Sequence, residues 1–212
     1  MRKIKKIFTV LSFIFIIVFG YTACGELSEL EKAINNSDVS NVFIEIHSSA
    51  ATRVATQTID GNKSKITEDD VVTYIERSGD KYYRYFCSNS VWHKEDFTDF
   101  ISKFDVAVFS HAEYLFFFEA KDFVNEDGGY SMTESASQAY CEKTFVKTWE
   151  SLGAQVNFAE VEYVTLKILN EKISEFEIKY SLILNEQPVQ TNIIKLLLSN
   201  YGTVKVDLPK IE

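Results

Sequence analysis

The sequence predicts an α+β fold in which one antiparallel sheet, able to curve as an unclosed barrel, wraps around helices on one face. Short runs of alternating apolar and polar residues, joined by tight turns, occur before residue 97 and after residue 161. Between these two groups, apolar residues recur at helical spacing. Strands grouped on either side of helices are typical of an antiparallel sheet that packs its helices on a single face.

The first group of strands follows a short amphipathic helix. Leu27, Leu30 and Ile34 share one face of this helix, at spacings of i, i+3 and i+7. Alternation with a period of two begins at residue 42, and the turn formers Asp60-Gly61-Asn62 separate two of the strands. The strands expected here are residues 42–46, 52–59, 71–77, 81–87 and 91–93.

The middle of the chain has the spacing of helices. Phe97, Phe100, Ile101, Phe104 and Val108 would form one apolar face of a helix. The aromatic run 114–118 has no clear period, so the sequence leaves its conformation open.

A further helix is expected before the last strands. Phe145, Trp149 and Leu152 line one face of it, and Gly153 can end it in a left-handed conformation. Residues 131–134 have the spacing of a capping box that could start it.

The last part of the chain returns to strands. In the first of these strands Phe176, Ile178, Tyr180 and Leu182 share one face, and charged or polar residues alternate with them. Residues 193–199 and 204–208 are expected to form the strands that follow.

The N-terminus has the physical features of an export signal. Residues 1–6 contain four basic residues and no acidic one, and residues 7–23 form an uncharged and mostly apolar run. In such a signal the basic end stays in the cytoplasm while the apolar stretch enters the bilayer. We therefore expect residues 1–23 to be a signal peptide and residues 24–212 to be a single extracytoplasmic domain.

The junction Thr22-Ala23-Cys24 resembles the lipobox of bacterial lipoproteins. Tyr21 departs from that pattern, which usually has Leu or another aliphatic residue at this position. The resemblance implies cleavage before Cys24 and a diacylglycerol on its sulfur, which would anchor the protein to the extracytoplasmic face of the cell membrane. Two other interpretations stay open: an uncleaved transmembrane helix, for which 17 residues are at the short limit, and a plain cleaved signal.

The charge of the chain limits its partners. Residues 1–23 contain four of the 22 basic residues and none of the 31 acidic ones, so the remainder has a net charge of −13. Nucleic acid binding needs a positive surface, and this class of partner is therefore excluded. The same charge disfavours docking of the folded domain on anionic headgroups, so the covalent lipid would do the anchoring.

Two cysteines remain besides Cys24. In an exported protein Cys87 and Cys141 could form one disulfide. The alternative is two free thiols that are buried as small apolar side chains. Sequence alone does not place their Cα atoms within bonding range, so both alternatives stay open.

No pattern in the sequence indicates catalysis. The three histidines lie far apart, and none has the spacing of a metal site such as HExxH. The glycine-rich loops of nucleotide-binding proteins and the serine motif of hydrolases do not occur either. We therefore expect a protein that is not an enzyme and that has no metal or cofactor.

The order of expected elements, after a lipobox, resembles the LolA/LppX-type lipoprotein carriers. The residues that carry the resemblance are Asp60-Gly61-Asn62-Lys63, Tyr82-Tyr83-Arg84-Tyr85, Val91-Trp92-His93-Lys94, the helical stretch 97–108 and the strands of 161–208. The resemblance implies an unclosed antiparallel barrel over helices, with a concave apolar face that holds acyl chains or lipoproteins. It offers no catalytic or ligand-binding motif to transfer.

Two functions follow as hypotheses. The first is a membrane-anchored binding or carrier protein, in which Phe176, Ile178, Tyr180 and Leu182 face a lipid or an apolar segment. These four residues could equally well fill a closed core. The second is a surface structural or interaction lipoprotein without a ligand cavity.

The lipid anchor can be tested directly. The mature protein should incorporate radioactive palmitate, and Cys24→Ser should abolish the label because the acylated sulfur is lost. Labelling that is unchanged in the Cys24→Ser protein would contradict the assignment of the anchor.

Overall fold

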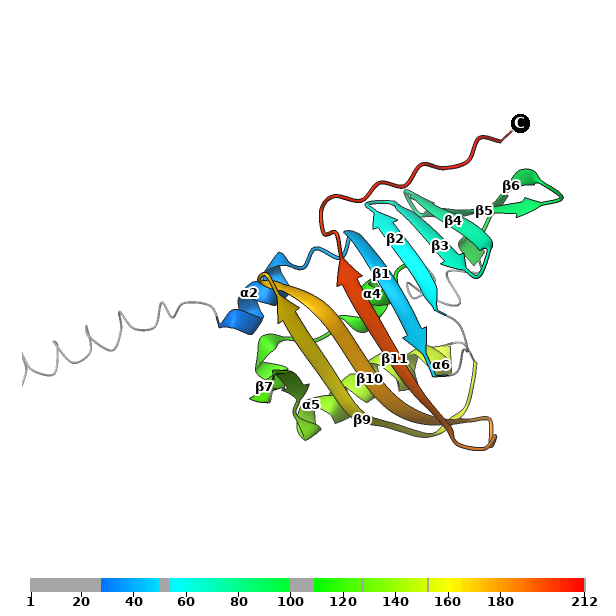
Figure 1. Ribbon diagram of the computed structural model, residues 1–212. Helices are drawn as coiled ribbons and strands as arrows, with labels where there is room; N and C mark the ends of the chain where they lie inside the picture. Colours follow the sequence, from blue (N-terminus) through cyan, green and yellow to red (C-terminus); the bar gives the residue numbers. More distant parts are fainter. Residues whose placement is uncertain (1–27, 50–53, 100–108, 127, 152, 212) are drawn as a thin grey trace, which may run out of the picture.

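The chain forms one large antiparallel sheet with helices on one side (Figure 1). The structure is a computed structural model that describes residues 28–49, 54–99, 109–126, 128–151 and 153–211. Within these residues the sheet has eleven strands in the order β6-β5-β4-β3-β2-β1-β11-β10-β9-β8-β7. All neighbouring strands are antiparallel and the sheet does not close, which confirms the predicted fold class.

Six strands run as a meander from the centre of the sheet to one edge. They are β1 (Asn41–Ser48), β2 (Ala55–Asp60), β3 (Lys63–Glu68), β4 (Val71–Ser78), β5 (Lys81–Ser88) and β6 (Val91–Asp96). Gly61 and Gly79 lie in two of the turns with φ of 59° and 60°, a conformation that favours glycine. β3 is not among the expected strands, because only Ser64 of its residues is fully buried and no apolar alternation marks it.

The other five strands start at the opposite edge and return to the centre. They are β7 (Phe123–Glu126), β8 (Gly129–Met132), β9 (Val156–Leu169), β10 (Lys172–Leu184) and β11 (Gln190–Ser199). β11 pairs with β1, from Phe43 opposite Ser199 to Ser48 opposite Ile194. The first and last strands are therefore neighbours in the middle of the sheet, and β6 and β7 are its outermost strands.

The helices occupy the connections and the start of the chain. They are α2 (Glu29–Asn36), α4 (His111–Leu115), the 3₁₀ turn η2 (Ala120–Asp122), α5 (Glu134–Cys141), the π-helical turn η3 (Glu142–Val146) and α6 (Lys147–Ser151). In Figure 1, α4, α5 and α6 lie behind the sheet. No helix in the described part of the chain is long and apolar enough to cross a membrane.

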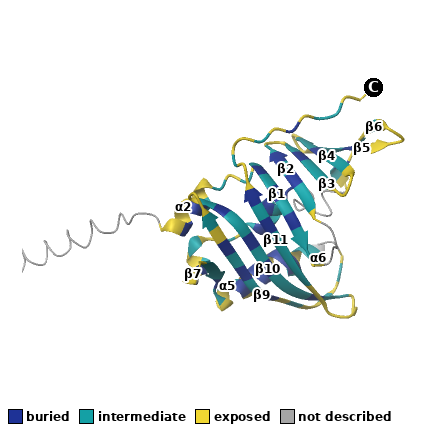
Figure 2. Ribbon diagram, viewed as in Figure 1, coloured by how far each residue is buried: buried dark blue, intermediate teal, exposed yellow. Residues whose placement is uncertain are grey.

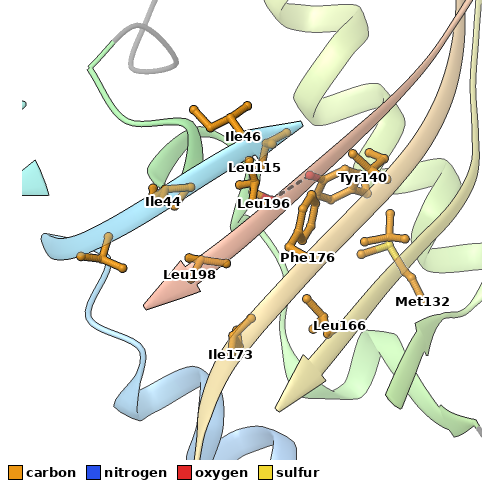
Figure 3. Close-up of a cluster of buried hydrophobic side chains, with 14 of the residues drawn as sticks. Ile44, Ile46, Leu115, Met132, Tyr140, Leu166, Ile173, Phe176, Leu196 and Leu198 are labelled. Carbon is orange, nitrogen blue, oxygen red and sulfur yellow. Dashed lines mark hydrogen bonds between the residues drawn. The ribbon is translucent and has the colours of Figure 1, made fainter. Parts of the chain in front are cut away.

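The core lies between the helices and one face of the sheet (Figures 2 and 3). Val42, Ile44 and Ile46 on β1 are buried at every second position, as strand alternation requires. Leu196 and Leu198 lie opposite Ile46 and Ile44 on β11 and extend the same apolar surface. Burial of each such side chain contributes about 1.5–3 kcal/mol to folding.

The aromatic run 114–118 covers this core. Its first residues belong to α4, and the chain then continues without regular structure. The rings of Phe116 and Phe118 lie 5.4 Å and 6.1 Å from the ring of Phe176. Aromatic side chains of this run therefore pack over β10.

The C-terminal segment differs from its prediction. Residues 204–208 are extended but form no strand, so the strand expected there is wrong. Both edges of β1 are already paired, with β2 and β11, so β1 offers this segment no free edge. Instead, the backbone N–H of Val204 donates to Asn41 Oδ1 and that of Val206 donates to Asp60 Oδ2.

The predicted helix boundaries are correct in part. Gly153 has φ of 81° and its N–H donates to the Glu150 carbonyl oxygen, which confirms the left-handed helix end. The helix starts two residues later than the predicted capping box, because Thr133 is the residue whose side chain accepts from Ala136 N–H. Residues 100–108 of the helix predicted from Phe97 lie outside the described residues.

A buried glutamine ties α4 to the sheet. The Nε2 of Gln57 donates to the Phe109 carbonyl oxygen at 2.8 Å and to Ser64 Oγ at 3.1 Å. Its Oε1 accepts from the backbone N–H of His111 at 3.0 Å and lies 3.2 Å from the ring Nδ1. Since a carbonyl only accepts and a backbone N–H only donates, these partners fix the amide orientation and require the proton on Nδ1.

Removal of this amide should destabilise the fold. Gln57→Leu leaves the Phe109 carbonyl and the His111 N–H without their partner inside the protein, which should lower the free energy of unfolding by about 2–3 kcal/mol. Chemical denaturation followed by tryptophan fluorescence measures this loss. The control is Thr58→Val on the opposite face of β2; an equal effect of the two substitutions would contradict the role of Gln57.

Burial also makes stability depend on His111. Burial lowers its pKa from 6.5 to about 4, so the unfolded chain binds the proton more readily between these values. The contribution of His111 to stability is therefore complete above about pH 6.5 and is lost as the pH falls towards 4. We expect the drop in Tm between pH 7 and pH 4.5 to be smaller in His111→Asn. An NMR titration midpoint of His111 near 6.5 would contradict this prediction.

Candidate functional site

The four residues predicted to face an apolar ligand lie in the core. Phe176, Ile178 and Leu182 are 0%, 0% and 4% exposed. Tyr180 is partly buried, and the ring of Phe145 from η3 stacks on it with 4.3 Å between the ring centroids. Helical and loop side chains thus pack directly on this face of β10.

The cysteines are placed differently from one another. Cys24 lies outside the described residues. Cys87 is an exposed free thiol on β5, and Cys141 is a buried free thiol at the end of α5. Figure 1 shows β5 and α5 at opposite ends of the sheet, so the disulfide considered from the sequence is not formed in this structure.

No metal site emerges from the described residues, among which no group of three or more histidine, cysteine, aspartate or glutamate side chains could hold an ion. His47 contacts Glu45 at 2.6 Å, and His93 stacks on Phe86 with 5.3 Å between the ring centroids. His111 is held by Gln57. The three histidines therefore have separate structural surroundings.

A groove lies where the helices meet one half of β9. β8 pairs with β9 only at Tyr130 opposite Leu166 and Ser131 opposite Thr165. The first half of β9 therefore has no strand beside it on this side, among the residues that the structure describes. α5 and η3 pack against β9 instead, and between them lies a hollow of about 1070 Å³, which we call the α5–β9 groove.

The lining of the α5–β9 groove is partly apolar. Phe158 is 41% exposed and Val146 is partly buried, whereas Met132 and Val161, which also line the groove, are buried. A large aromatic side chain at this exposure is available to a ligand, whereas the core aromatics are not. Phe158 thus makes the α5–β9 groove more accessible to an apolar ligand than the buried face of β10.

Carboxylates surround this apolar lining. Glu134 and Glu142 come from the helical side, and Glu160 and Glu162 come from β9. Of these four, only Glu162 has an ion pair within the described chain, with Lys179 at 2.7 Å. The groove is therefore lined by both apolar and negatively charged side chains.

Two tyrosines fix the helical wall of the groove. Tyr140 on α5 donates to the Leu115 carbonyl oxygen at 2.7 Å, and Tyr114 on α4 donates to the Thr144 carbonyl oxygen at 2.6 Å. The second acceptor lies in the π-helical turn η3, where wider backbone bonding leaves carbonyls available to side chains. α4, α5 and η3 are therefore held together as one unit.

Cys141, at the end of α5, lines the helical side of the groove. Burial raises the pKa of Cys141, with smaller contributions from the charges of Glu142 and Glu160. Hydrogen bonding from the backbone of Val161 opposes this increase. A neutral, buried thiol of this kind is a poor nucleophile.

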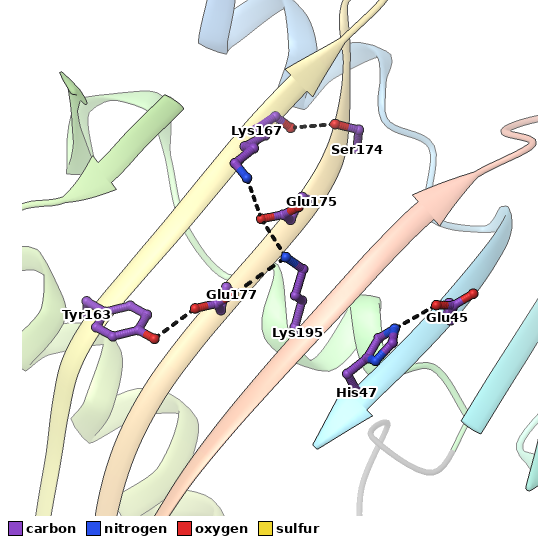
Figure 4. A network of polar contacts seen from close by, with 8 residues as sticks. All are labelled: Glu45, His47, Tyr163, Lys167, Ser174, Glu175, Glu177 and Lys195. Atoms are coloured by element: carbon purple, nitrogen blue, oxygen red, sulfur yellow. Dashed lines mark hydrogen bonds and ion pairs between the residues drawn. The ribbon is translucent and has the colours of Figure 1, made fainter. Parts of the chain in front are cut away.

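A second hollow of about 680 Å³ lies beside the β7–β8 hairpin, next to the polar face of β9, β10 and β11. Glu175 accepts from Lys167 at 2.9 Å and from Lys195 at 3.0 Å (Figure 4). Burial opposes ionisation of Glu175, but these two lysines lower its pKa overall. The network satisfies its own charges, which suits a structural role.

A tyrosine extends this polar network. Tyr163 donates to Glu177 at 2.8 Å, and Lys195 lies 3.7 Å from the same carboxylate (Figure 4). Burial and the bond to Glu177 raise the pKa of Tyr163 to about 12, so the phenol stays protonated at neutral pH. The phenol of Tyr163 is therefore not prepared for proton transfer under these conditions.

The comparisons with known proteins give a general similarity. No family model and no curated protein matches the chain. Among solved structures, the chain is similar to the lipoprotein LppX of Mycobacterium tuberculosis, with 14% sequence identity and a TM-score of 0.40. The match covers 85% of this chain and 97% of LppX. At this TM-score the similarity supports no inference about ligand or activity.

Proposed function

We propose that the protein is a bacterial lipoprotein, anchored to the extracytoplasmic face of the cell membrane through lipid on Cys24. The support is the basic start, the apolar run 7–23 and the Thr22-Ala23-Cys24 junction. Residues 1–23 are removed, and residues 24–212 form the mature domain. Only residues 25–28 separate Cys24 from α2, which starts at Glu29, so the folded part begins close to the membrane.

The mature domain binds a ligand and carries out no chemistry of its own. The ligand is a lipid or another apolar molecule or segment, and its site is the α5–β9 groove. The observation that carries this proposal is the accessible hollow of about 1070 Å³ with Phe158 exposed in its wall. This volume is at the upper end of the range of about 300–1,000 Å³ that is usual for ligand pockets, and the lining combines apolar with acidic and other polar side chains.

The second candidate is a surface structural or interaction lipoprotein. It is favoured by the dense packing of Phe116, Phe118 and Phe145 on β10, which fills the face where the sequence had suggested a ligand. In this case the α5–β9 groove would hold no small ligand.

Native mass spectrometry of the full-length protein, released from membranes in a mild detergent, separates the two candidates. The wild type should retain a non-covalent apolar ligand. Phe158→Asp should weaken the affinity for this ligand by about tenfold and so lower the bound fraction, since a tenfold change in Kd needs only about 1.4 kcal/mol and burial of a Phe side chain contributes about 1.5–3 kcal/mol.

The control for this experiment is Val189→Asp, at another exposed apolar residue, which lies between β10 and β11 and outside the groove. It should leave the bound fraction unchanged. A wild type that shows only its own mass, together with no uptake of a fluorescent fatty acid, would support the structural or interaction lipoprotein instead.

A further inference from the structure

The first half of β9 is an open strand edge within the described fold. Residues 156–163 pair with β10 on one side, while β8 reaches only residues 165 and 166 on the other. Figure 1 shows α5, a helix, beside this part of the strand. An unpaired edge presents backbone N–H and C=O groups that can pair with another extended chain.

The direction of one N–H shows which backbone groups face the groove. Ile193 accepts from the N–H of Ser49, so its backbone groups face β1 and those of the preceding Asn192 face β10. Tyr180, opposite Asn192, therefore directs its own groups toward β11, and its partner on β9, Val161, directs its N–H away from β10. Backbone groups alternate in direction along an antiparallel strand, so the N–H of Ala159 faces the same side. The nearby thiol on α5 is a weak acceptor, weaker than the carbonyl that a neighbouring strand would supply.

The carboxylates near this edge favour an added strand that contains basic residues. Glu134, Glu142 and Glu160 have no ion pair within the described chain. A second copy of this protein would bring carboxylates against carboxylates, which disfavours edge-to-edge pairing of two copies. A segment with lysine or arginine would find three unpaired carboxylates within the same groove.

The pattern of β9 also sets the spacing of the added residues. Glu160 is exposed, whereas its neighbours Ala159 and Val161 face the core side and are half-buried and buried. Side chains directly opposite each other on adjacent strands share a face. A partner strand would therefore place basic residues beside Glu160 and apolar residues beside Ala159 and Val161, in alternation.

We propose that the α5–β9 groove binds an extended segment of another polypeptide, with alternating basic and apolar residues, which adds to β9 as a further strand. This inference rests on the proposed binding function and names a polypeptide, rather than a lipid, as the ligand. Strand addition gives affinity through backbone hydrogen bonds and specificity through the alternating side chains.

Fluorescence anisotropy with the full-length protein in nonionic detergent tests the inference. The probe is a fluorescein-labelled peptide of alternating lysine and valine. A labelled peptide of the same composition in scrambled order is the control. The alternating peptide should bind more tightly than the scrambled one. The double variant Glu134→Lys/Glu160→Lys should weaken its binding by about tenfold or more, because two attractive charges become repulsive.

The control variant is Glu171→Lys, which makes the same charge change at an exposed residue in the β9–β10 turn. It should leave peptide affinity unchanged. Hydrogen exchange provides a second measurement: the Ala159 amide should become protected when the peptide is bound. This protection does not depend on whether the charge variants fold.

The outcomes separate the inference from the proposed function. Equal binding of the two peptides, or binding without protection of Ala159, would overturn strand addition. Uptake of a fluorescent fatty acid without peptide binding would also overturn it, while supporting the lipid-binding form of the proposed function. Binding of neither probe would overturn both proposals.

Discussion

A sheet with one apolar face must be covered on that face, and this requirement determines most of the structure. The strands of both halves bury alternate residues on the same side, so the connections between β6 and β9 have to cross it. Gln57 attaches the start of this cover, and the rings of Phe116, Phe118 and Phe145 fill the space above β10. The α5–β9 groove lies where the cover meets the part of β9 that β8 does not reach.

The same requirement explains why the ligand site is proposed at the rim of the sheet. An open carrier would need its concave face free, but here that face is packed with aromatic side chains at ring distances typical of protein cores. Polar networks stabilise the opposite face, where Glu175 is held between Lys167 and Lys195 (Figure 4). What remains accessible is a border between helix and strand, with some apolar surface and a strand edge that no other strand of the described chain pairs with.

The sequence predicted local features well and long-range ones poorly. The alternation of Phe176 to Leu182 and the turn at Gly61 depend on neighbouring residues, and both appear in the structure as expected. Residues 204–208 alternate equally well, yet they form no strand because β1 already has two partners. The groove and the Gln57 junction join residues that are distant in the chain, and no local pattern indicates which helix will lie beside which strand.

The pairing of β1 with β11 has a consequence for the order in which the protein can fold. Synthesis proceeds from the N-terminus, so β1 to β6 can assemble as a local meander long before residue 199 exists. Until then the inner edge of β1 has no native partner, and the central contacts span about 150 residues of chain. The nascent protein therefore exposes one edge of β1, which later lies in the middle of the sheet. The sheet is complete only after β11 has been synthesised.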